Sequence, residues 1–132
     1  MTVRVLVVDS SPETVGLARQ ALVDLDCDVS PATSISLALF LAHKNPPDLI
    51  VSGLEMTDGG GLELLAEVKA DRELQEIPFI FLAAGGGPVE GRALAAGAEQ
   101  FLTLPVRPDV LLGRLKPFLR ERRVSRPPQS PE

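Results

Sequence analysis

Residues 3–12, VRVLVVDSSP, decide the fold because they join a buried strand directly to the start of a helix. The run Val3–Val8 is almost entirely apolar and β-branched, which is typical of a strand buried on both faces of a parallel sheet. Pro12 suits the first position of a helix, where its missing N–H costs nothing, and Ser11 is the expected N-cap. The segment therefore predicts a strand, a short turn that begins at Asp9, and a helix.

The same alternation of strand and helix repeats along the chain. Further strands are predicted at residues 28–32, 48–52, 78–82 and 100–104, and further helices at 34–44, 62–71, 89–96 and 108–119. Five strand–helix units with short connections predict a parallel sheet covered by helices on both faces. Pro31 lies inside the second strand and lacks an N–H, so this strand belongs at a sheet edge. The expected fold is α/β: a doubly wound (βα)5, flavodoxin-like three-layer sandwich whose parallel five-stranded sheet has the order 2-1-3-4-5.

Apolar residues recur at helical spacing, which predicts the face that each helix buries. In the first helix these residues are Val15, Ala18, Leu22 and Leu25, in the third Leu65 and Val68, and in the fifth Leu111, Leu115 and Phe118.

The composition indicates one globular domain. The chain has 132 residues, of which 45% are hydrophobic and 23% charged, and a chain of this length buries enough surface to fold without a covalent staple. Its one cysteine, Cys27, excludes an internal disulfide and fits a reducing compartment. We find neither a run of about 20 apolar residues that would cross a bilayer nor a signal peptide, so the expected location is the cytoplasm.

The charge distribution limits the partners of the domain. Thirteen Lys and Arg stand against 18 Asp and Glu, a net charge of −5, which argues against nucleic acid or an anionic membrane as a partner. Residues 120–132 are Pro-rich and reverse the sign, with four basic and two acidic side chains. We expect residues 1–119 to form the domain, and residues 120–132 to be a disordered tail or linker.

In a doubly wound sheet, the functional crevice lies outside the carboxyl ends of the strands. The segments that follow strands one, three, four and five are Asp9-Ser10, Gly53–Gly61, Ala83–Gly87 and Leu104-Pro105. The glycine triplets at 59–61 and 85–87 lack the lysine and hydroxyl residue of a phosphate-binding loop, so we interpret them as flexible loops.

At these places the sequence resembles the receiver domain of bacterial two-component response regulators, from about Val3 to Leu119. The resemblance is carried by VLVVDSSP (5–12), PPDLIVSGLEMTDGGGLELL (46–65), IPFIFLAA (77–84), AAGAEQFLTLP (95–105) and LLGRLKPFL (111–119). It implies a role in two-component or phosphorelay signal transduction, and a cis peptide bond between Leu104 and Pro105.

The sequence departs from the family where receivers carry their chemistry. Receivers phosphorylate an aspartate after strand three, hold magnesium with two acids after strand one, and bind the phosphoryl group with a hydroxyl residue and a lysine. The resemblance places Gly53 at the phosphoacceptor position, Ser10 at the second acid, Ala83 at the hydroxyl and Leu104 at the lysine, while Asp9 and Pro105 are retained. Glycine supplies no nucleophile, and one carboxylate makes a poor magnesium site. We therefore expect a degenerate phosphorylation pocket: a pseudo-receiver with no catalytic residues, no cofactor, and weak or absent magnesium binding.

Other polar residues near the crevice have alternative interpretations. Asp9 is either a vestigial metal ligand, helped by Glu55 where the family offers a backbone carbonyl, or a solvated or capping acid, which we favour. Ser52 is expected to point into the core, on the opposite face from Gly53. Asp58 is interpreted as a solvated residue in a mobile loop. His43 and Cys27 are predicted near helix ends, away from the crevice and without partners for catalysis.

The resemblance also suggests a partner surface. Phe101 occupies the strand-five position at which receivers carry an aromatic residue whose rotamer reports activation, so it is either an interface anchor or a packing residue. The surface of the fourth helix, fifth strand and fifth helix is expected to include Leu94, Phe101, Val106 and Leu112. The sequence thus predicts a module that binds another signalling protein, or a second copy of itself, without phosphorylation. The alternative is a small-molecule sensor that uses the emptied apolar pocket.

Overall fold

Seven strands and five helices make up the part of the chain that the computed structural model describes, residues 2–85 and 87–125, with side chains described as far as residue 119. In chain order the elements are β1 (Val3–Val8), α1 (Pro12–Ala21), β2 (Cys27–Ala32), α2 (Ile35–Lys44), β3 (Leu49–Ser52), β4 (Glu55–Met56), β5 (Gly59–Gly60), α3 (Gly61–Ala70), β6 (Phe79–Ala83), α4 (Pro88–Ala95), β7 (Gln100–Thr103) and α5 (Pro108–Ser125).

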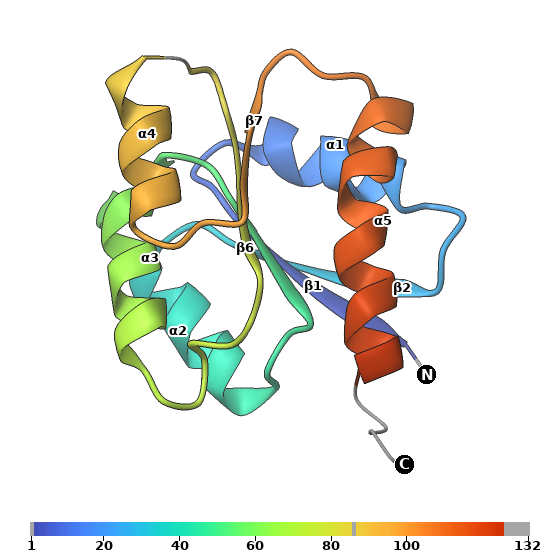
Figure 1. Cartoon of the computed structure of the whole chain (residues 1–132), viewed down its shortest axis with the longest axis horizontal. Helices are drawn as coiled ribbons and strands as arrows, with labels where there is room; N and C mark the ends of the chain where they lie inside the picture. Colours follow the sequence, from blue (N-terminus) through green and yellow to red (C-terminus); the bar gives the residue numbers. More distant parts are fainter. Residues whose placement is uncertain (1, 86, 126–132) are drawn as a thin grey trace.

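The five longer strands form one parallel sheet in the order β2-β1-β3-β6-β7. Counted along these five strands, this is the predicted order 2-1-3-4-5, which is confirmed. β2, which contains Pro31, is an edge strand as expected, because proline has no N–H to donate to a second neighbouring strand. The connections place α2, α3 and α4 on one face of the sheet and α1 and α5 on the other (Figure 1).

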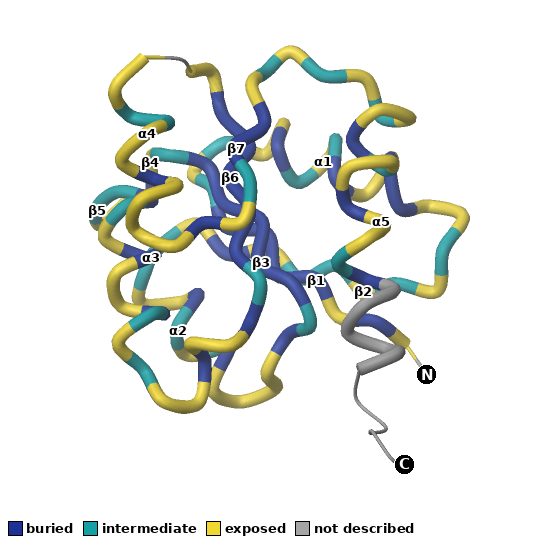
Figure 2. The backbone as a smooth tube through the Cα atoms, in the orientation of Figure 1, coloured by how far each residue is buried: buried dark blue, intermediate teal, exposed yellow. Residues whose placement is uncertain are grey.

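Alternating residues of each strand fill the two cores. In β6, Phe79 and Phe81 face α2, α3 and α4, while Ile80 and Leu82 face α1 and α5. The two phenylalanine rings lie with their centroids 5.1 Å apart. The buried part of the tube in Figure 2 accordingly follows the central strands, with exposed segments on the outer helices.

Two helices differ from the prediction. In α1 the buried face begins at Thr14, which is 5% exposed, rather than at Val15, which is half-buried. The helix ends at Ala21, so Leu22 and Leu25, which were predicted within it, follow its end. The fifth helix ends at Ser125 and not at Leu119, so residues 120–125 are helical and not an irregular tail. Four of these six residues are arginine or glutamate, which are good helix formers. The rest of the proposed tail, residues 126–132, lies outside the described residues. Within the described chain, no helix has the length and apolarity needed to cross a bilayer.

A small hairpin between β3 and α3 was not predicted. β4 and β5 pair antiparallel, with Glu55 opposite Gly60 and Met56 opposite Gly59. The interpretation of residues 59–61 as a flexible loop is therefore wrong: Gly59 has a φ of 156° within the paired strand, and Gly61 begins α3. A side chain on Gly61 would meet the Gly53 carbonyl at 2.3 Å, so only glycine lets α3 start this close to the end of β3.

The turn of this hairpin fixes the start of α2. Asp58 Oδ1 accepts the N–H of Ile35 at 2.6 Å, and Oδ2 accepts both the N–H and the hydroxyl of Ser36 at 3.1 Å. Ser34 Oγ accepts the N–H of Leu37. The first three N–H groups of α2, which have no partner inside the helix, are thus all satisfied. Asp58 is therefore a capping residue, and its interpretation as a merely solvated side chain in a mobile loop is wrong.

This cap makes the stability of the fold dependent on pH. The N–H of Ile35 above all holds the pKa of Asp58 below its ordinary value of 3.8. Desolvation opposes this effect, and the N–H and hydroxyl of Ser36 add to the lowering of the pKa. Because the folded pKa is depressed, the contribution of the carboxylate is present above pH 3.8 and is lost as the pH falls through the folded pKa. We expect Asp58→Ala to be less stable than the wild type at neutral pH in urea unfolding, with a gap that shrinks below pH 3.8.

Asp58→Asn is the control for this prediction, because the amide keeps an acceptor oxygen without the titrating charge. A gap between wild type and Asp58→Ala that does not change on acidification would contradict the assigned role of the charge.

Candidate functional site

The segments singled out in the sequence converge at one edge of the sheet, the upper edge in Figure 1. Asp9 follows β1, Gly53 follows β3, Ala83 ends β6, and Leu104 follows β7. The Leu104–Pro105 peptide bond is cis, as expected. Ser52 is fully buried, and its hydroxyl donates to the Gly53 carbonyl at 2.7 Å, so its predicted orientation into the core is confirmed.

Asp9 fills the space in which a side chain at position 53 would begin. A Cβ built on Gly53 would lie 2.2 Å from Asp9 Oδ2 and 2.5 Å from its Cγ. The Asp9 carboxylate is held there by two donors: the Thr14 hydroxyl at 2.6 Å to Oδ2 and the Ser11 N–H at 3.1 Å to Oδ1. Because Thr14 lies in the first turn of α1, this hydrogen bond also connects α1 to the ends of β1 and β3.

The residues at this edge do not fit a magnesium site. Gly53 has no carboxylate, and both oxygens of Asp9 already accept hydrogen bonds. The Glu55 carbonyl, at the position that the family offers to the metal, accepts the N–H of Ser10 at 3.0 Å. Magnesium needs several oxygen ligands at about 2.1 Å in octahedral geometry. The interpretation of Asp9 as a capping acid therefore agrees better with the contacts than its interpretation as a metal ligand.

An open cleft of about 720 Å³ lies beside Asp9. It is lined by Asp9, Ser11, Glu13, Thr14, Leu17, Leu54, Glu55, Leu82, Ala83, Ala84, Leu104, Pro105 and Val106. Ala83 and Leu104 are among these lining residues. Gly53, which the predicted pocket also included, does not line the cleft, because it is buried behind Asp9. Ser10 also lies outside the lining.

Phe101 is a packing residue. It is 8% exposed, its ring centroid lies 5.6 Å from that of Phe81, and Gly85 leaves room for its edge. Its interpretation as a surface anchor is therefore wrong. Of the other residues expected on that surface, Leu94 of α4 is 44% exposed, whereas Val106 and Leu112 are half-buried against the core shared by α1 and α5.

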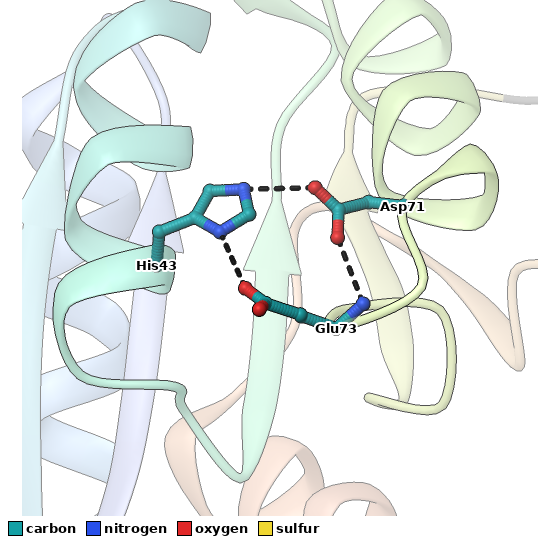
Figure 3. Close-up of side chains that lie close together, drawn as sticks. All are labelled: His43, Asp71 and Glu73. Atoms are coloured by element: carbon teal, nitrogen blue, oxygen red, sulfur yellow. Dashed lines mark hydrogen bonds and ion pairs between the residues drawn. The ribbon is translucent and has the colours of Figure 1, made fainter.

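His43 has partners that the sequence did not reveal. Its Nε2 lies 2.8 Å from Asp71 Oδ2, and its Nδ1 lies 3.1 Å from Glu73 Oε1 (Figure 3). Glu73 N–H in turn donates to Asp71 Oδ1 at 2.8 Å. Among the described side chains, these three form the one group with metal-ligating atoms within 4.8 Å of one another. Each ring nitrogen lies within hydrogen-bond distance of a carboxylate oxygen, so the group links the end of α2 to the loop after α3. Cys27 begins β2 and does not lie at a helix end.

The fold and the geometry of this edge define a class: a doubly wound, parallel α/β domain with its crevice at the carboxyl ends of the strands. Residues 5–116 match the response regulator receiver domain, and the chain belongs to that family.

Relatives and solved structures agree with this assignment. The uncharacterized 14.6 kDa protein in the sodA1 3' region of Leptolyngbya boryana is 34% identical over 109 residues, which cover 82% of this chain and 83% of that protein. Response regulator PleD of Caulobacter vibrioides is 30% identical over 123 residues, 91% of this chain but 27% of PleD. The structure of chemotaxis response regulator CheY4 of Vibrio cholerae superimposes with a TM-score of 0.82 at 28% identity, covering 90% of this chain and all of that one.

Sequence reasoning missed several residues of the site. Thr14 holds Asp9, and Glu13, Leu17 and Leu54 line the cleft. The sequence hinted at the role of Thr14 only in that a hydroxyl residue occurs in the first turn of the predicted helix, close to Asp9 in the chain. The packing of α1 against the sheet decides which residue of that turn points inward.

Proposed function

We propose that this receiver domain is a pseudo-receiver, a non-enzymatic module of two-component signalling that acts through protein–protein contacts without phosphorylation. One observation carries the proposal: the Asp9 carboxylate lies where the side chain of a phosphoacceptor would begin, held by Thr14 and Ser11. A hydrogen-bonded carboxylate in that position leaves no nucleophile at residue 53 and repels an incoming phosphate.

The neighbouring positions support the same proposal. Ala83 offers no hydroxyl, and Leu104 packs as an apolar side chain against the core shared by α1 and α5. Neither can neutralise the charge of a phosphoryl group, which relies on charged or hydroxyl donors. The inward Phe101, packed on Phe81, is in keeping with a domain that holds one conformation.

We place the partner surface on α4, β7 and α5. Leu94 supplies an exposed apolar side chain on α4, and Val110 of α5 is 46% exposed. A partner that covers these apolar side chains would remove them from water, which favours association. The partner would be another signalling protein or a second copy of the chain.

Amide NMR tests the proposal, since the chain has no tryptophan whose fluorescence could report on the pocket. We expect the spectrum to remain unchanged on titration with millimolar magnesium and then beryllofluoride, which mimics a phosphoryl group. A receiver that carries the aspartate, titrated in parallel, is the positive control. Saturable shifts at Asp9, Gly53 and Ala83 would contradict the proposal. Spectra at rising protein concentration report whether the α4–β7–α5 surface joins two copies.

The cleft favours a second candidate function, the sensing of a small molecule. Its volume of about 720 Å³ lies within the range of about 300–1,000 Å³ that small-molecule sites occupy. Most of its lining residues are apolar, and Leu104 forms part of the wall without closing it.

A further inference from the structure

We infer that the cleft beside Asp9 selects small organic cations, molecules with an apolar body and one amine or guanidine group. This inference rests on the second candidate function, the sensing of a small molecule, and assigns the ligand class. It depends on three features of the cleft: an apolar wall, a carboxylate rim, and the absence of a competing basic side chain.

The apolar wall would take the body of the ligand. It is lined by Leu82 and Ala83 at the end of β6, by Leu17 of α1, and by Leu104 and Val106 after β7. Burial of an apolar group here contributes roughly 25 cal/mol per Å² of surface removed from water. The wall contacts only the apolar body of the ligand. It therefore contributes equally to the affinity for a neutral and a charged ligand of the same shape.

The rim supplies the preference for positive charge. Asp9, Glu13 and Glu55 all line the cleft. Glu13 and Glu55 are exposed, and neither side chain makes a hydrogen bond or an ion pair with another described residue. Asp9, by contrast, is already held by Thr14 and Ser11. The two glutamates are therefore the carboxylates available to a ligand.

No described lysine or arginine lines the cleft to offset these charges. Arg107 follows the lining residue Val106, but its guanidinium is bound to Asp109 through two hydrogen bonds, of 3.1 and 3.0 Å. An anionic ligand would thus meet three carboxylates and no free basic group. Phosphate and nucleotides are disfavoured for this reason.

The spacing of the carboxylates favours an organic cation over a metal ion. Among the described side chains, the one group of three ligating residues within 4.8 Å of one another is that of His43, on another part of the surface. Asp9, Glu13 and Glu55 do not converge in this way, so they cannot jointly coordinate one small ion. A charged group on an apolar body can bind beside Glu13 and Glu55 without such convergence.

The test compares three ligands of one shape: phenylbutylamine, phenylbutanol and phenylbutyrate. We expect saturable amide shifts at Ala83, Ala84 and Leu104 with the amine, at an affinity about tenfold above that of the alcohol and further above that of the carboxylate. Added salt should narrow the difference between amine and alcohol, because it screens exposed charges.

Paired variants identify the carboxylates responsible. Glu13→Gln combined with Glu55→Gln should reduce the affinity for the amine about tenfold and leave that for the alcohol unchanged. Glu67→Gln combined with Glu76→Gln is the matched control, because it removes the same charge from exposed residues outside the cleft.

The outcomes test separately the ligand class and the sensing of a small molecule. Equal binding of all three ligands would overturn the selection of cations and leave small-molecule sensing intact. An absence of shifts in the cleft with any of the three would overturn both. The control variant of Glu67 and Glu76 could lose as much affinity for the amine as the cleft variant does. The preference for cations would then come from the net charge of the protein, and the assigned site would be wrong.

Discussion

Replacing Gly53 by alanine is expected to lower the free energy of unfolding by about 2–3 kcal/mol, a large effect for one methyl group. The new Cβ would lie 2.2 Å from Asp9 Oδ2, so the carboxylate must leave its position. Thr14, which is 5% exposed, would then lose the acceptor of its hydroxyl. Overpacking and an unsatisfied buried hydroxyl each destabilise by about 1–3 kcal/mol. Urea unfolding measures the change.

A double-mutant cycle shows whether Asp9 is the cause. Asp9→Ala removes the obstructing carboxylate, so Gly53→Ala should cost at least about 1 kcal/mol less in that background than in the wild type. Additive effects of the two substitutions would contradict the contact between these residues.

Gly16→Ala is the matched control for the glycine substitution. A Cβ at Gly16 would meet nothing within 4 Å, in an exposed position of α1. There the same substitution should stabilise the protein by about 0.5–1 kcal/mol, because alanine is the better helix former. The opposite signs at Gly53 and Gly16 would separate the local collision from the general effect of adding a methyl group.

The fold could be predicted from local patterns because each element carries its own signal. The β-branched run Val3–Val8, the N-cap Ser11 and Pro31 in an edge strand define strand, helix and sheet edge within short segments. The β4–β5 hairpin carries no such signal. Its strands have two residues each, and one consists of glycines, which are otherwise rare in strands. Its position depends on contacts with α2 through Asp58.

The candidate site could be predicted only in part for a similar reason. The resemblance to receiver domains shows which of the family's side chains this sequence lacks, so the missing carboxylate at Gly53 was apparent. It does not show what fills the space left behind. Asp9 enters that space because Thr14 comes from a different element and holds it there, and this depends on how α1 packs on the sheet. The cleft likewise exists only once the segments after β1, β6 and β7 are placed side by side.

Restoring the phosphoacceptor by Gly53→Asp alone is expected to give no more phosphorylation by acetyl phosphate than the wild type shows. The new carboxylate would compete with Asp9 for one space and raise local negative charge without magnesium to neutralise it. Position 83 would still lack a hydroxyl, and position 104 would still lack a cation. Groups that stabilise a developing charge contribute about 10²–10³ in rate each. The absence of both groups is therefore expected to lower the rate of phosphorylation by the product of the two factors.

Intact mass, read as the addition of one phosphoryl group, measures the product. The combined variant Ser10→Asp, Gly53→Asp, Ala83→Thr and Leu104→Lys returns the missing groups, and we expect it to become phosphorylated in the presence of magnesium. Circular dichroism of each variant shows that it is folded before labelling. Efficient labelling of Gly53→Asp alone would mean that the Asp9 side chain moves away from residue 53. It would also mean that phosphorylation needs neither a hydroxyl at position 83 nor a lysine at position 104. In that case the missing carboxylate at residue 53 would be the one barrier to phosphorylation, and the expectation that Ser10, Ala83 and Leu104 also disable the pocket would be wrong.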